Sequence, residues 1–350
     1  MSGGRSDESR DESSRGSSLT LAVCQLGHRF ADVGHSGAMA CEDHPVSVGR
    51  FAPSPTGTLH IGNLRTGLAA WLFARAAGSR FLLRFEDLDS ATVRAEHFDS
   101  QRRDLERLGL TWDGDPLRQS ERTDRYETVL SDLDRAGLTY RCWCSRREIR
   151  EAASAPHHPP GHYPGTCRSL TGAETRQREA SGRPPAVRLR TRGEEVEIID
   201  LLHGIHRGTV DDLVLRRGDG TPAYNLVVVV DDAAQGIEEV VRADDLLSST
   251  PRHAHLLDLL GLDRPAWAHV PLVLADTGDR LAKRHGSVTL QDRLTLGDSI
   301  RRVIAELGRS LGLPVPESEI RASDLIERFD LSLIDLDPWT LSPRQMTEPW

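Results

Sequence analysis

The 350-residue sequence is almost without lysine. Of its 44 lysine and arginine side chains, Lys283 is the single lysine, so arginine supplies nearly every cation of the chain. A lysine ammonium is a compact charge on a flexible stem, whereas a guanidinium is a planar fork. The retention of one lysine makes Lys283 a candidate functional residue, with an ordinary surface cation as the alternative.

Long apolar runs and a regular set of cysteines are also missing. No stretch of about 18 apolar residues occurs, which excludes a transmembrane helix. The five cysteines are odd in number and sparse, which argues against a disulfide scaffold. Residues 1–18 mix acidic and arginine side chains and lack the apolar core of a secretory signal. We therefore expect a cytoplasmic protein that has no membrane contact and acts as a monomer.

An excess of positive charge is absent as well. The chain carries 44 basic and 53 acidic side chains, which gives a formal net charge of −9. This balance argues against binding to nucleic acid through bulk positive charge, although it allows a local groove lined by arginine. Hydrophobic residues make up 38% of the chain and charged residues 28%, a composition typical of folded globular proteins.

The order of the expected elements predicts an α/β fold. Residues 1–45 are rich in small and charged residues and are expected to be a disordered extension. Residues 46–138 and 201–265 are expected to form the two halves of one nucleotide-binding domain. The alternation of strand and helix in this region favours a parallel sheet. Residues 266–350 are expected to form a loop followed by a helical region. The main expected elements are strands at Val46–Phe51, Phe81–Phe85 and Asn225–Val230, and helices beginning near His60, Thr123 and Thr250.

Residues 139–200 interrupt this alternation and are expected to form an inserted module. The segment holds Cys142, Cys144 and Cys167 within a short stretch that is also rich in proline and histidine. Thiolates are good zinc ligands, and clustered cysteines in a cytosolic chain favour a metal site over a disulfide. The alternative is a set of free, buried cysteines.

The segment from Arg50 to Asn63, with the sequence RFAPSPTGTLHIGN, predicts a nucleotide-binding turn. A strand leads through a loop with two prolines and one glycine to the start of a helix. Helix N-termini bind phosphate through unpaired N–H groups and the helix dipole. Gly62 would let a ribose or base approach the backbone, and His60 can donate a hydrogen bond to a phosphate oxygen. The alternative is a simple turn into a core helix.

Five strings of the sequence together resemble the catalytic core of the class I glutamyl-tRNA synthetases. They are PSPTGTLHIGN, FEDLD, AYNLVVVVDD, VVRADDLL and RLAKR, in that order, between about Val48 and about Thr289. The resemblance implies a Rossmann-like parallel sheet, with HIGN matching the HIGH signature of the family and RLAKR its KMSKS loop. It further implies that His60, Asn63 and Lys283 are catalytic and that Gly62 and Lys283 bind ATP, which enters with Mg²⁺. The sequence departs from the family pattern at Asn63, Arg280 and Ala282.

The same resemblance implies a pocket for L-glutamate. Glu86 matches the carboxylate that meets the substrate amino group, and arginine forks suit the substrate carboxylates. The alternatives are a capping or surface role for Glu86 and a rim salt bridge for Arg242. The implied glutamate-binding residues are Arg50, Phe51, Ala52, Pro53, Ser54, Glu86, Tyr224 and Arg242.

The length of the chain narrows the resemblance to a truncated paralogue family, the glutamyl-Q tRNA(Asp) synthetases. Only 67 residues follow Lys283, too few for an anticodon-binding domain. This family activates glutamate with ATP and transfers it to the queuosine base at the wobble position, in the anticodon loop of tRNA(Asp). It also binds one structural Zn²⁺, which implies as ligands Cys142, Cys144, Tyr163 and Cys167. General zinc chemistry would instead favour a histidine as the fourth donor, with candidates at His157, His158 and His162.

Three other functions stay open on the sequence alone. The first is a truncated glutamyl-tRNA synthetase that charges a tRNA 3′ end. The second is a small-molecule adenylyltransferase with a related nucleotide-binding motif, against which the glutamate-pocket matches argue. The third is a catalytically silent paralogue that binds RNA or zinc, and ATP-dependent turnover of glutamate would distinguish it from the enzymes.

Overall fold

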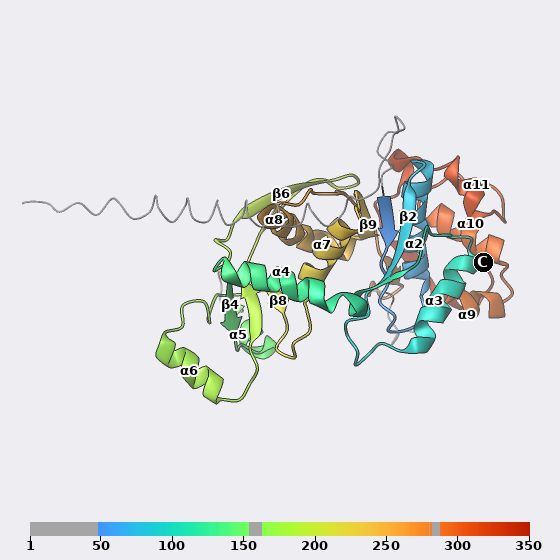
Figure 1. The fold of residues 1–350 in the computed structure, drawn as a ribbon. Helices are drawn as coiled ribbons and strands as arrows, with labels where there is room; N and C mark the ends of the chain where they lie inside the picture. The colour runs from blue at the N-terminus through green and yellow to red at the C-terminus, as the bar shows by residue number, and fades with distance from the viewer. Residues whose placement is uncertain (1–47, 154–162, 280, 282–287) are drawn as a thin grey trace, which may run out of the picture.

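The computed structural model describes residues 48–153, 163–279, 281 and 288–350, and the side chains of residues 150–153 are not described (Figure 1). Several predicted features therefore lie outside the described residues: the extension, Lys283, and the three histidines at positions 157, 158 and 162. The described part of the chain has a large sheet with helices on both sides, and a smaller lobe that carries α5 and α6 at the opposite end from α9, α10 and α11.

The main sheet has seven strands in the described residues. The order in which the chain adds strands to the sheet reverses between β1 and β9. From β1 the chain adds β2 and β3 on one side, while β9 and β10 lie on the other side. All neighbouring pairs are parallel except β6 with β7. The expected parallel α/β sheet is thus confirmed. In spatial order the strands are β3 (Leu117–Arg118), β2 (Arg80–Phe85), β1 (Val48–Phe51), β9 (Glu239–Ala243), β10 (Ala266–Val270), β6 (Glu195–Asp200) and β7 (Gly204–Thr209).

Two predicted helices are confirmed together with their buried faces. Helix α2 (Ile61–Ala76) follows β1 and buries the predicted apolar positions against β1, β2 and β9. Helix α4 (Thr123–Arg135) buries its predicted apolar positions and packs against α7 (Tyr224–Ala234) and β4 (Thr139–Cys142). Both end close to a glycine in the left-handed region, Gly78 at φ 67° and Gly137 at φ 71°, where a residue without a Cβ is favoured. The predicted inward side chains are Leu64, Leu68, Trp71 and Leu72 in α2, and Tyr126, Val129, Leu130 and Leu133 in α4.

The predicted strand at Asn225–Val230 is wrong, because this segment belongs to helix α7 (Tyr224–Ala234). Its valines are buried on all sides, and a short, fully apolar run has no periodicity that separates a buried strand from a buried helix. Valine in a helix costs less than about 0.7 kcal/mol relative to alanine. The free energy gained by burying the valine side chain exceeds this cost. The helix also turns Asp231 and Asp232 toward different partners.

The sequence predicts Thr250 as the cap and Pro251 as the first helical residue, whereas helix α8 (Thr250–Leu260) begins one residue earlier. Thr250 is the first helical residue and Ser249 occupies the cap position, while Gly261 ends the helix at φ 66°. The hydroxyl of Thr250 does not cap the helix and instead accepts a hydrogen bond from Arg242.

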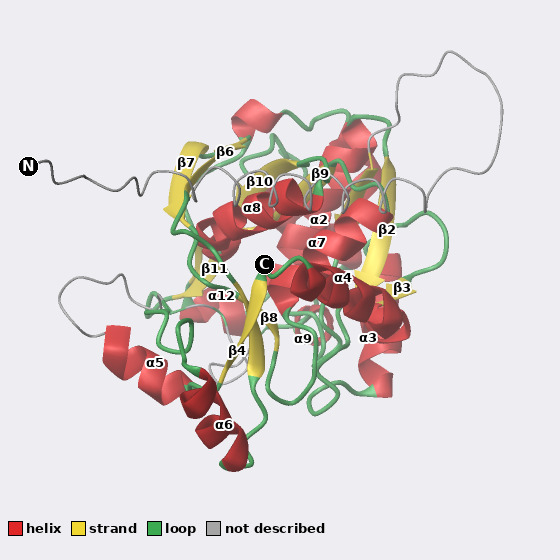
Figure 2. Ribbon diagram, turned by 60° about the vertical axis from the view of Figure 1, so that its left-hand side comes forward, coloured by secondary structure: helices red, strands yellow, loops and turns green. Residues whose placement is uncertain are grey.

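The module between the two halves contains a separate antiparallel sheet (Figure 2). Helix α5 (Arg146–Ala153) and helix α6 (Gly172–Ala180) lie beside it, and helix α3 (Ala95–Arg107) lies on the other side of the molecule. The expected boundary of the module at residue 200 does not coincide with the division between the two sheets. Strand β6, which ends at residue 200, belongs to the main sheet, and β8, which follows it, belongs to the small sheet. The strands of the small sheet are β4 (Thr139–Cys142), β5 (Ala186–Leu189) and β8 (Val214–Arg216).

The C-terminal region is largely helical, as predicted, and packs on the core that surrounds α2. A short parallel pair of β11 and β12 ties it to the segment that follows β10. No helix of the described ranges is long and apolar enough to cross a membrane. The elements are β11 (Val273–Ala275), α9 (Leu290–Thr295), α10 (Ile300–Ser310), α11 (Ala322–Ile326), β12 (Trp339–Leu341) and α12 (Pro343–Thr347).

Candidate active site and metal centre

A cleft of about 580 Å³ lies at the carboxyl ends of β1 and β9, where the strand order of the sheet reverses. Open α/β sheets bind their ligands at this position. The cleft brings together most of the residues that the sequence singled out. The predicted residues that line it are Arg50, Phe51, Ala52, Pro53, Ser54, His60, Asn63, Glu86, Tyr224 and Arg242.

The HIGN segment forms the start of α2 and faces this cleft. His60 is the cap residue: its Nδ1 accepts the backbone N–H of Asn63 at 3.3 Å, and Asn63 Oδ1 accepts the backbone N–H of His60 at 3.3 Å. This reciprocal cap fixes both side chains at a helix N-terminus, where negative charge is favoured. Gly62 does not line the cleft among the described residues. A Cβ added at Gly62 would lie 3.0 Å from the His60 ring, so the glycine makes room for that ring.

Gln101 holds the loop before α2, which contains Pro53, Pro55 and Gly57, in place. The sequence did not point to this residue. Its Nε2 donates to the carbonyl oxygens of Ser54 at 3.0 Å and Gly57 at 2.7 Å. Gln101 lies in α3 and is buried. The loop backbone therefore has a defined position before any ligand binds.

Two arginines and two carboxylates form a charged cluster beneath the cleft. Asp232 accepts from Arg50 Nε at 3.1 Å and from Arg84 Nη1 at 2.7 Å. Burial alone would raise the pKa of Asp232, but the two guanidinium groups lower it to about 2. Glu86 lies 3.7 Å from Arg84 Nη2, and burial nevertheless raises its pKa. An ammonium group bound beside Glu86 would relieve this burial cost.

Arg242, by contrast, has only neutral hydrogen-bond partners in the described residues. They include two histidine rings, a threonine hydroxyl and the phenol of Tyr224 at 3.4 Å. The side chain is 6% exposed, and burial lowers the pKa of Arg242. A buried cation whose charge has no close counter-charge is suited to bind a substrate carboxylate.

Both flanks of the RLAKR loop reach the cleft. Leu281, the second residue of RLAKR, is buried and lines the cleft. After the loop, Val288 accepts the backbone N–H of Ile61 at 2.8 Å, and Thr289 pairs with His60. The residues between, Lys283 among them, lie outside the described ranges, and the chain enters and leaves them beside the HIGN turn.

A second cleft of about 540 Å³ adjoins the first and extends toward the inserted module. The two clefts share Ser54, Glu86 and Tyr224. Its outer wall carries arginines from the module and from the turn after β8, namely Arg146, Arg183, Arg188 and Arg217.

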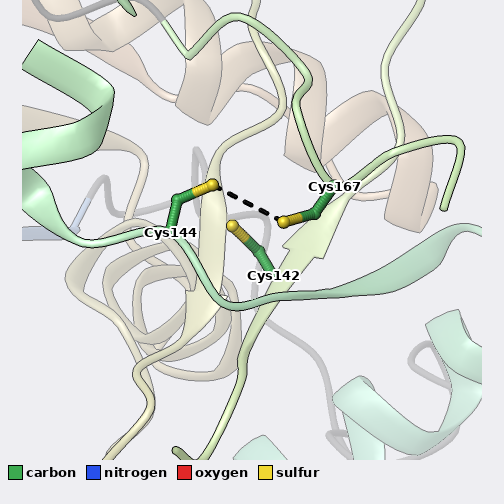
Figure 3. Close-up of side chains that lie close together, drawn as sticks. All are labelled: Cys142, Cys144 and Cys167. Carbon is green, nitrogen blue, oxygen red and sulfur yellow. Dashed lines mark hydrogen bonds between the residues drawn. The ribbon is translucent and has the colours of Figure 1, made fainter. Parts of the chain in front are cut away.

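The cysteines of the module converge as predicted (Figure 3). The Sγ atoms of Cys142, Cys144 and Cys167 lie within 4.8 Å of one another. Tyr163 Oη is 3.3 Å from the sulfur of Cys142 and 3.8 Å from that of Cys144, and it accepts the backbone N–H of Cys167 at 2.9 Å. Hydrogen bonding to Cys167 lowers the pKa of Cys142 to about 4. Three thiols and a phenol oxygen around one point fit a tetrahedral metal ion.

Several residues of the site were missed in the sequence. Arg84 and Asp232 belong to the ion-pair cluster that holds Arg50, and His253, His269 and Asp200 support Arg242 from behind. The sequence contained one signal that could have pointed to them, a charged or imidazole side chain inside an apolar segment. An example is the segment AWAHV around His269. Which of these would contact Arg242 depends on the order of β6, β10 and β9, which no local pattern contains.

The chain matches one described protein family over most of its length. Residues 46–346 match the tRNA synthetases class I (E and Q), catalytic domain. The chain belongs to this family. It is 57% identical to a glutamyl-Q tRNA(Asp) synthetase of Nocardia farcinica, over 86% of this chain and 95% of that one. It is 39% identical to glutamate–tRNA ligase 2 of Halorhodospira halophila, over 85% of this chain and 64% of that one.

A solved structure of the same family resembles the fold described above. It is a glutamate tRNA ligase from Elizabethkingia meningosepticum in complex with its amino acid, with a TM-score of 0.72 and 25% identity. The likeness covers 86% of this chain and 68% of the other. The expected class I synthetase fold is therefore confirmed.

Proposed function

We propose that this protein activates L-glutamate with ATP and transfers the glutamyl group to the queuosine base of tRNA(Asp). The observation that supports the first step, the activation of glutamate, is the cleft itself. It is lined by an acidic group, Glu86, by the buried cation of Arg242, and by His60 at the N-terminus of helix α2. Glutamate carries one ammonium and two carboxylates, and this arrangement complements both kinds of charge.

Activation on this site needs no nucleophile from the protein. A carboxylate oxygen of glutamate attacks the α-phosphorus of ATP, and pyrophosphate leaves with the electron pair of the broken P–O bond. Catalysis then rests on positioning and on neutralising charge that develops on the phosphates. We assign this work to His60, to Asn63, to the N–H groups at the start of α2, and to Lys283, with the Mg²⁺ that accompanies ATP.

The second cleft supports transfer to an RNA acceptor. It opens from Glu86 and Tyr224 toward the module, so a nucleoside entering there would meet the activated carboxyl group. Residues 139–192 contain 11 arginines and four acidic residues, whereas the whole chain has a net charge of −9. The arginine-rich side of the protein is thus the side that a polyanion would approach. A hydroxyl of the queuosine ring would attack the carbonyl carbon, and AMP would leave.

We further propose that the thiol cluster holds one Zn²⁺. Cys142, Cys144 and Cys167 would supply thiolates and Tyr163 the fourth donor. The bound ion would act as a structural cross-link that fixes the segment around Cys167 against β4.

Transfer of radiolabelled glutamate to defined tRNAs tests the function. We expect label on queuosine-containing tRNA(Asp) and none on tRNA(Asp) that lacks queuosine or on tRNA(Glu). A further substrate, queuosine-containing tRNA(Asp) without its 3′-terminal adenosine, separates the two acceptor sites. Full labelling of this shortened tRNA supports transfer to the base.

One second candidate is favoured by a specific comparison. The relative from Halorhodospira halophila is named a glutamate–tRNA ligase, which makes charging of a tRNA 3′ end the alternative. Label on tRNA(Glu), lost when the 3′ adenosine is removed, would support that alternative. The absence of glutamate-dependent pyrophosphate exchange would overturn both.

A further inference from the structure

Arg242 is anchored on its inner side by three short hydrogen bonds. Its Nε donates to His269 Nε2 at 3.0 Å, its Nη1 lies 3.1 Å from His253 Nδ1, and its Nη2 donates to Thr250 Oγ1 at 2.8 Å. All three partners are buried. These contacts fix the plane of the guanidinium group.

The remaining contacts of Arg242 are longer and lie on the cleft side. Nη1 is 3.4 Å from Tyr224 Oη and Nη2 is 3.5 Å from the carbonyl oxygen of Leu246, and both partners line the cleft. A bond at 3.4 to 3.5 Å is weak, so a carboxylate could replace these two partners. The anchored edge thus faces the protein and the exchangeable edge faces the cleft.

The anchoring fixes the protonation of His269. A guanidinium N–H can only donate, so His269 Nε2 has to be an acceptor without a proton. The proton of the neutral ring is then on Nδ1, and Nδ1 lies 2.5 Å from Asp200 Oδ2. Burial lowers the pKa of His269 and holds the pKa of His253 well below its usual value, so both rings are neutral near pH 7.

The two carboxylate oxygens of Asp200 accept from different groups. Oδ1 accepts three backbone N–H groups, those of Leu202 and His203 at 3.0 Å in the turn after β6 and that of His269 at 3.4 Å. Oδ2 lies 2.5 Å from Nδ1 of the His269 ring. Asp200 is 1% exposed and His269 is fully buried. Oδ1 therefore binds backbone N–H groups, and Oδ2 binds the imidazole.

We propose that Asp200 is a positioning residue for glutamate binding, acting through His269 on Arg242. Asp200 selects the Nδ1–H tautomer of His269, and this tautomer presents an acceptor that orients Arg242 toward the cleft. Because a neutral ring stands between them, Asp200 does not pair directly with Arg242, which keeps its charge for the substrate. The inference rests on the proposed function in one respect, namely that Arg242 binds a carboxylate of glutamate.

The replacement Asp200→Asn tests this chain of contacts with little change of shape. Its Oδ1 can still accept the two N–H groups of the turn, while Nδ2 now donates toward His269 Nδ1. The ring proton is then forced onto Nε2, where it opposes the N–H of Arg242. We expect the KM for glutamate to rise at least about tenfold, with the KM for ATP within about twofold. Asp258→Asn, which removes a surface ion pair with Arg264, is the matched control.

A second pair of variants covers the case that Asp200→Asn does not fold. In His269→Gln the amide oxygen can still accept from Arg242, whereas His269→Leu removes the acceptor at similar volume. A role confined to packing predicts that both variants behave alike. We expect the Leu variant to raise the KM for glutamate and the Gln variant to restore most of the affinity.

Nitrogen-15 NMR of the histidine rings supplies a readout that does not depend on activity. We expect His269 of the wild-type protein as a neutral Nδ1–H ring at pH 7, and as the Nε2–H tautomer in Asp200→Asn. An Nε2–H or doubly protonated ring in the wild type would overturn the proposal, as would an unchanged KM for glutamate in both Asp200→Asn and His269→Leu. A wild type without glutamate-dependent exchange would instead contradict the proposed function, while the NMR result would still decide whether Asp200 sets the tautomer.

Discussion

His60 and Asn63 cap the first turn of α2 for each other. Nδ1 of His60 accepts the N–H of Asn63, and Oδ1 of Asn63 accepts the N–H of His60, both at 3.3 Å. Because Nδ1 is an acceptor, a neutral His60 carries its proton on Nε2. The same pair of bonds that starts the helix therefore sets the tautomer of the residue assigned to the ATP phosphates.

Replacing Asn63 separates its capping role from its role in the cleft. Asn63→Ala removes the acceptor for the His60 N–H, and loss of such a cap costs about 1 kcal/mol. Asn63→Asp keeps that acceptor but exchanges the amide donor for a negative charge beside ATP. We expect a lower thermal midpoint for the Ala variant and an unchanged midpoint for the Asp variant, with pyrophosphate exchange reduced in both. Full exchange in Asn63→Asp would show that Asn63 is a cap and nothing more.

Lys283 is expected to neutralise the pyrophosphate that leaves ATP. Removal of one group that stabilises a transition-state charge typically slows a reaction by about 10²–10³-fold. We expect a loss of this size in the pyrophosphate exchange of Lys283→Ala, and partial activity in Lys283→Arg, whose charge remains but whose head group is a planar fork. Arg264→Ala, at a surface ion pair, is the control. Near-normal exchange in Lys283→Ala would contradict the assignment of the RLAKR loop.

The metal centre can be tested without an activity assay. Elemental analysis of the purified protein should find about one zinc per chain, and removal of the metal should lower the thermal midpoint. Tyr163→Phe removes the phenol oxygen that lies 3.3 Å from Cys142 and should reduce the zinc content. Tyr163→His supplies a nitrogen donor and should retain the ion. Full zinc occupancy in Tyr163→Phe would move the fourth ligand to one of the neighbouring histidines.

Much of the cleft could be predicted because its residues are near strand ends in the sequence. Arg50 is the last residue but one of β1, and Glu86 comes directly after β2. The local sequence pattern therefore places both residues at the same edge of the sheet. The resemblance to a family supplied the expected glutamate-binding role of all four residues, Arg50, Glu86, Tyr224 and Arg242. These predictions required no knowledge of how distant segments pack.

The residues that support Arg242 could not be predicted in this way. Asp200 and His269 meet because β6 and β10 are neighbours in the sheet, although 69 positions separate the two residues in the sequence. The error at Asn225–Val230 has a related cause, because burial on every side of α7 removes the polar face that marks a helix. In both cases tertiary packing carries information that a local window lacks.

Glu86 is expected to favour activity at the expense of stability. Burial raises its pKa, so the folded state holds the Glu86 proton more tightly than the unfolded state does. A carboxyl of this kind favours folding below the pKa of the unfolded chain, and that contribution is lost as the pH rises through the folded pKa. At pH 7, well above the pKa of the unfolded carboxyl, burial of Glu86 therefore costs stability. We expect Glu86→Gln to raise the midpoint of urea unfolding at pH 7 and to raise the KM for glutamate at least about tenfold. An unchanged KM would contradict its role as partner of the substrate ammonium.

Asp232 is expected to behave in the opposite way, because two buried arginines depend on it. Arg50 and Arg84 lower its pKa from the usual 3.8 to about 2, against the effect of burial. A depressed pKa contributes stability above the pKa of the unfolded chain, and this contribution is lost as the pH falls through the folded pKa. The window for Asp232 is thus between about pH 4 and pH 2, and the shift corresponds to about 2 kcal/mol.

Asp232→Asn would leave Arg50 and Arg84 buried without their carboxylate, and breaking a buried ion pair costs about 3–5 kcal/mol. We expect the free energy of urea unfolding to fall by this order at pH 7 relative to the wild type. The difference between the two proteins should stay constant down to about pH 5. It should shrink below about pH 4, where Asp232 of the unfolded wild-type chain takes up a proton and the folded protein does not yet do so. Asp258→Asn at the surface pair with Arg264 should change the free energy by less than about 1 kcal/mol at either pH. A difference between wild type and Asp232→Asn that is the same at pH 7 and pH 3 would show that the charge of Asp232 does not hold this cluster together.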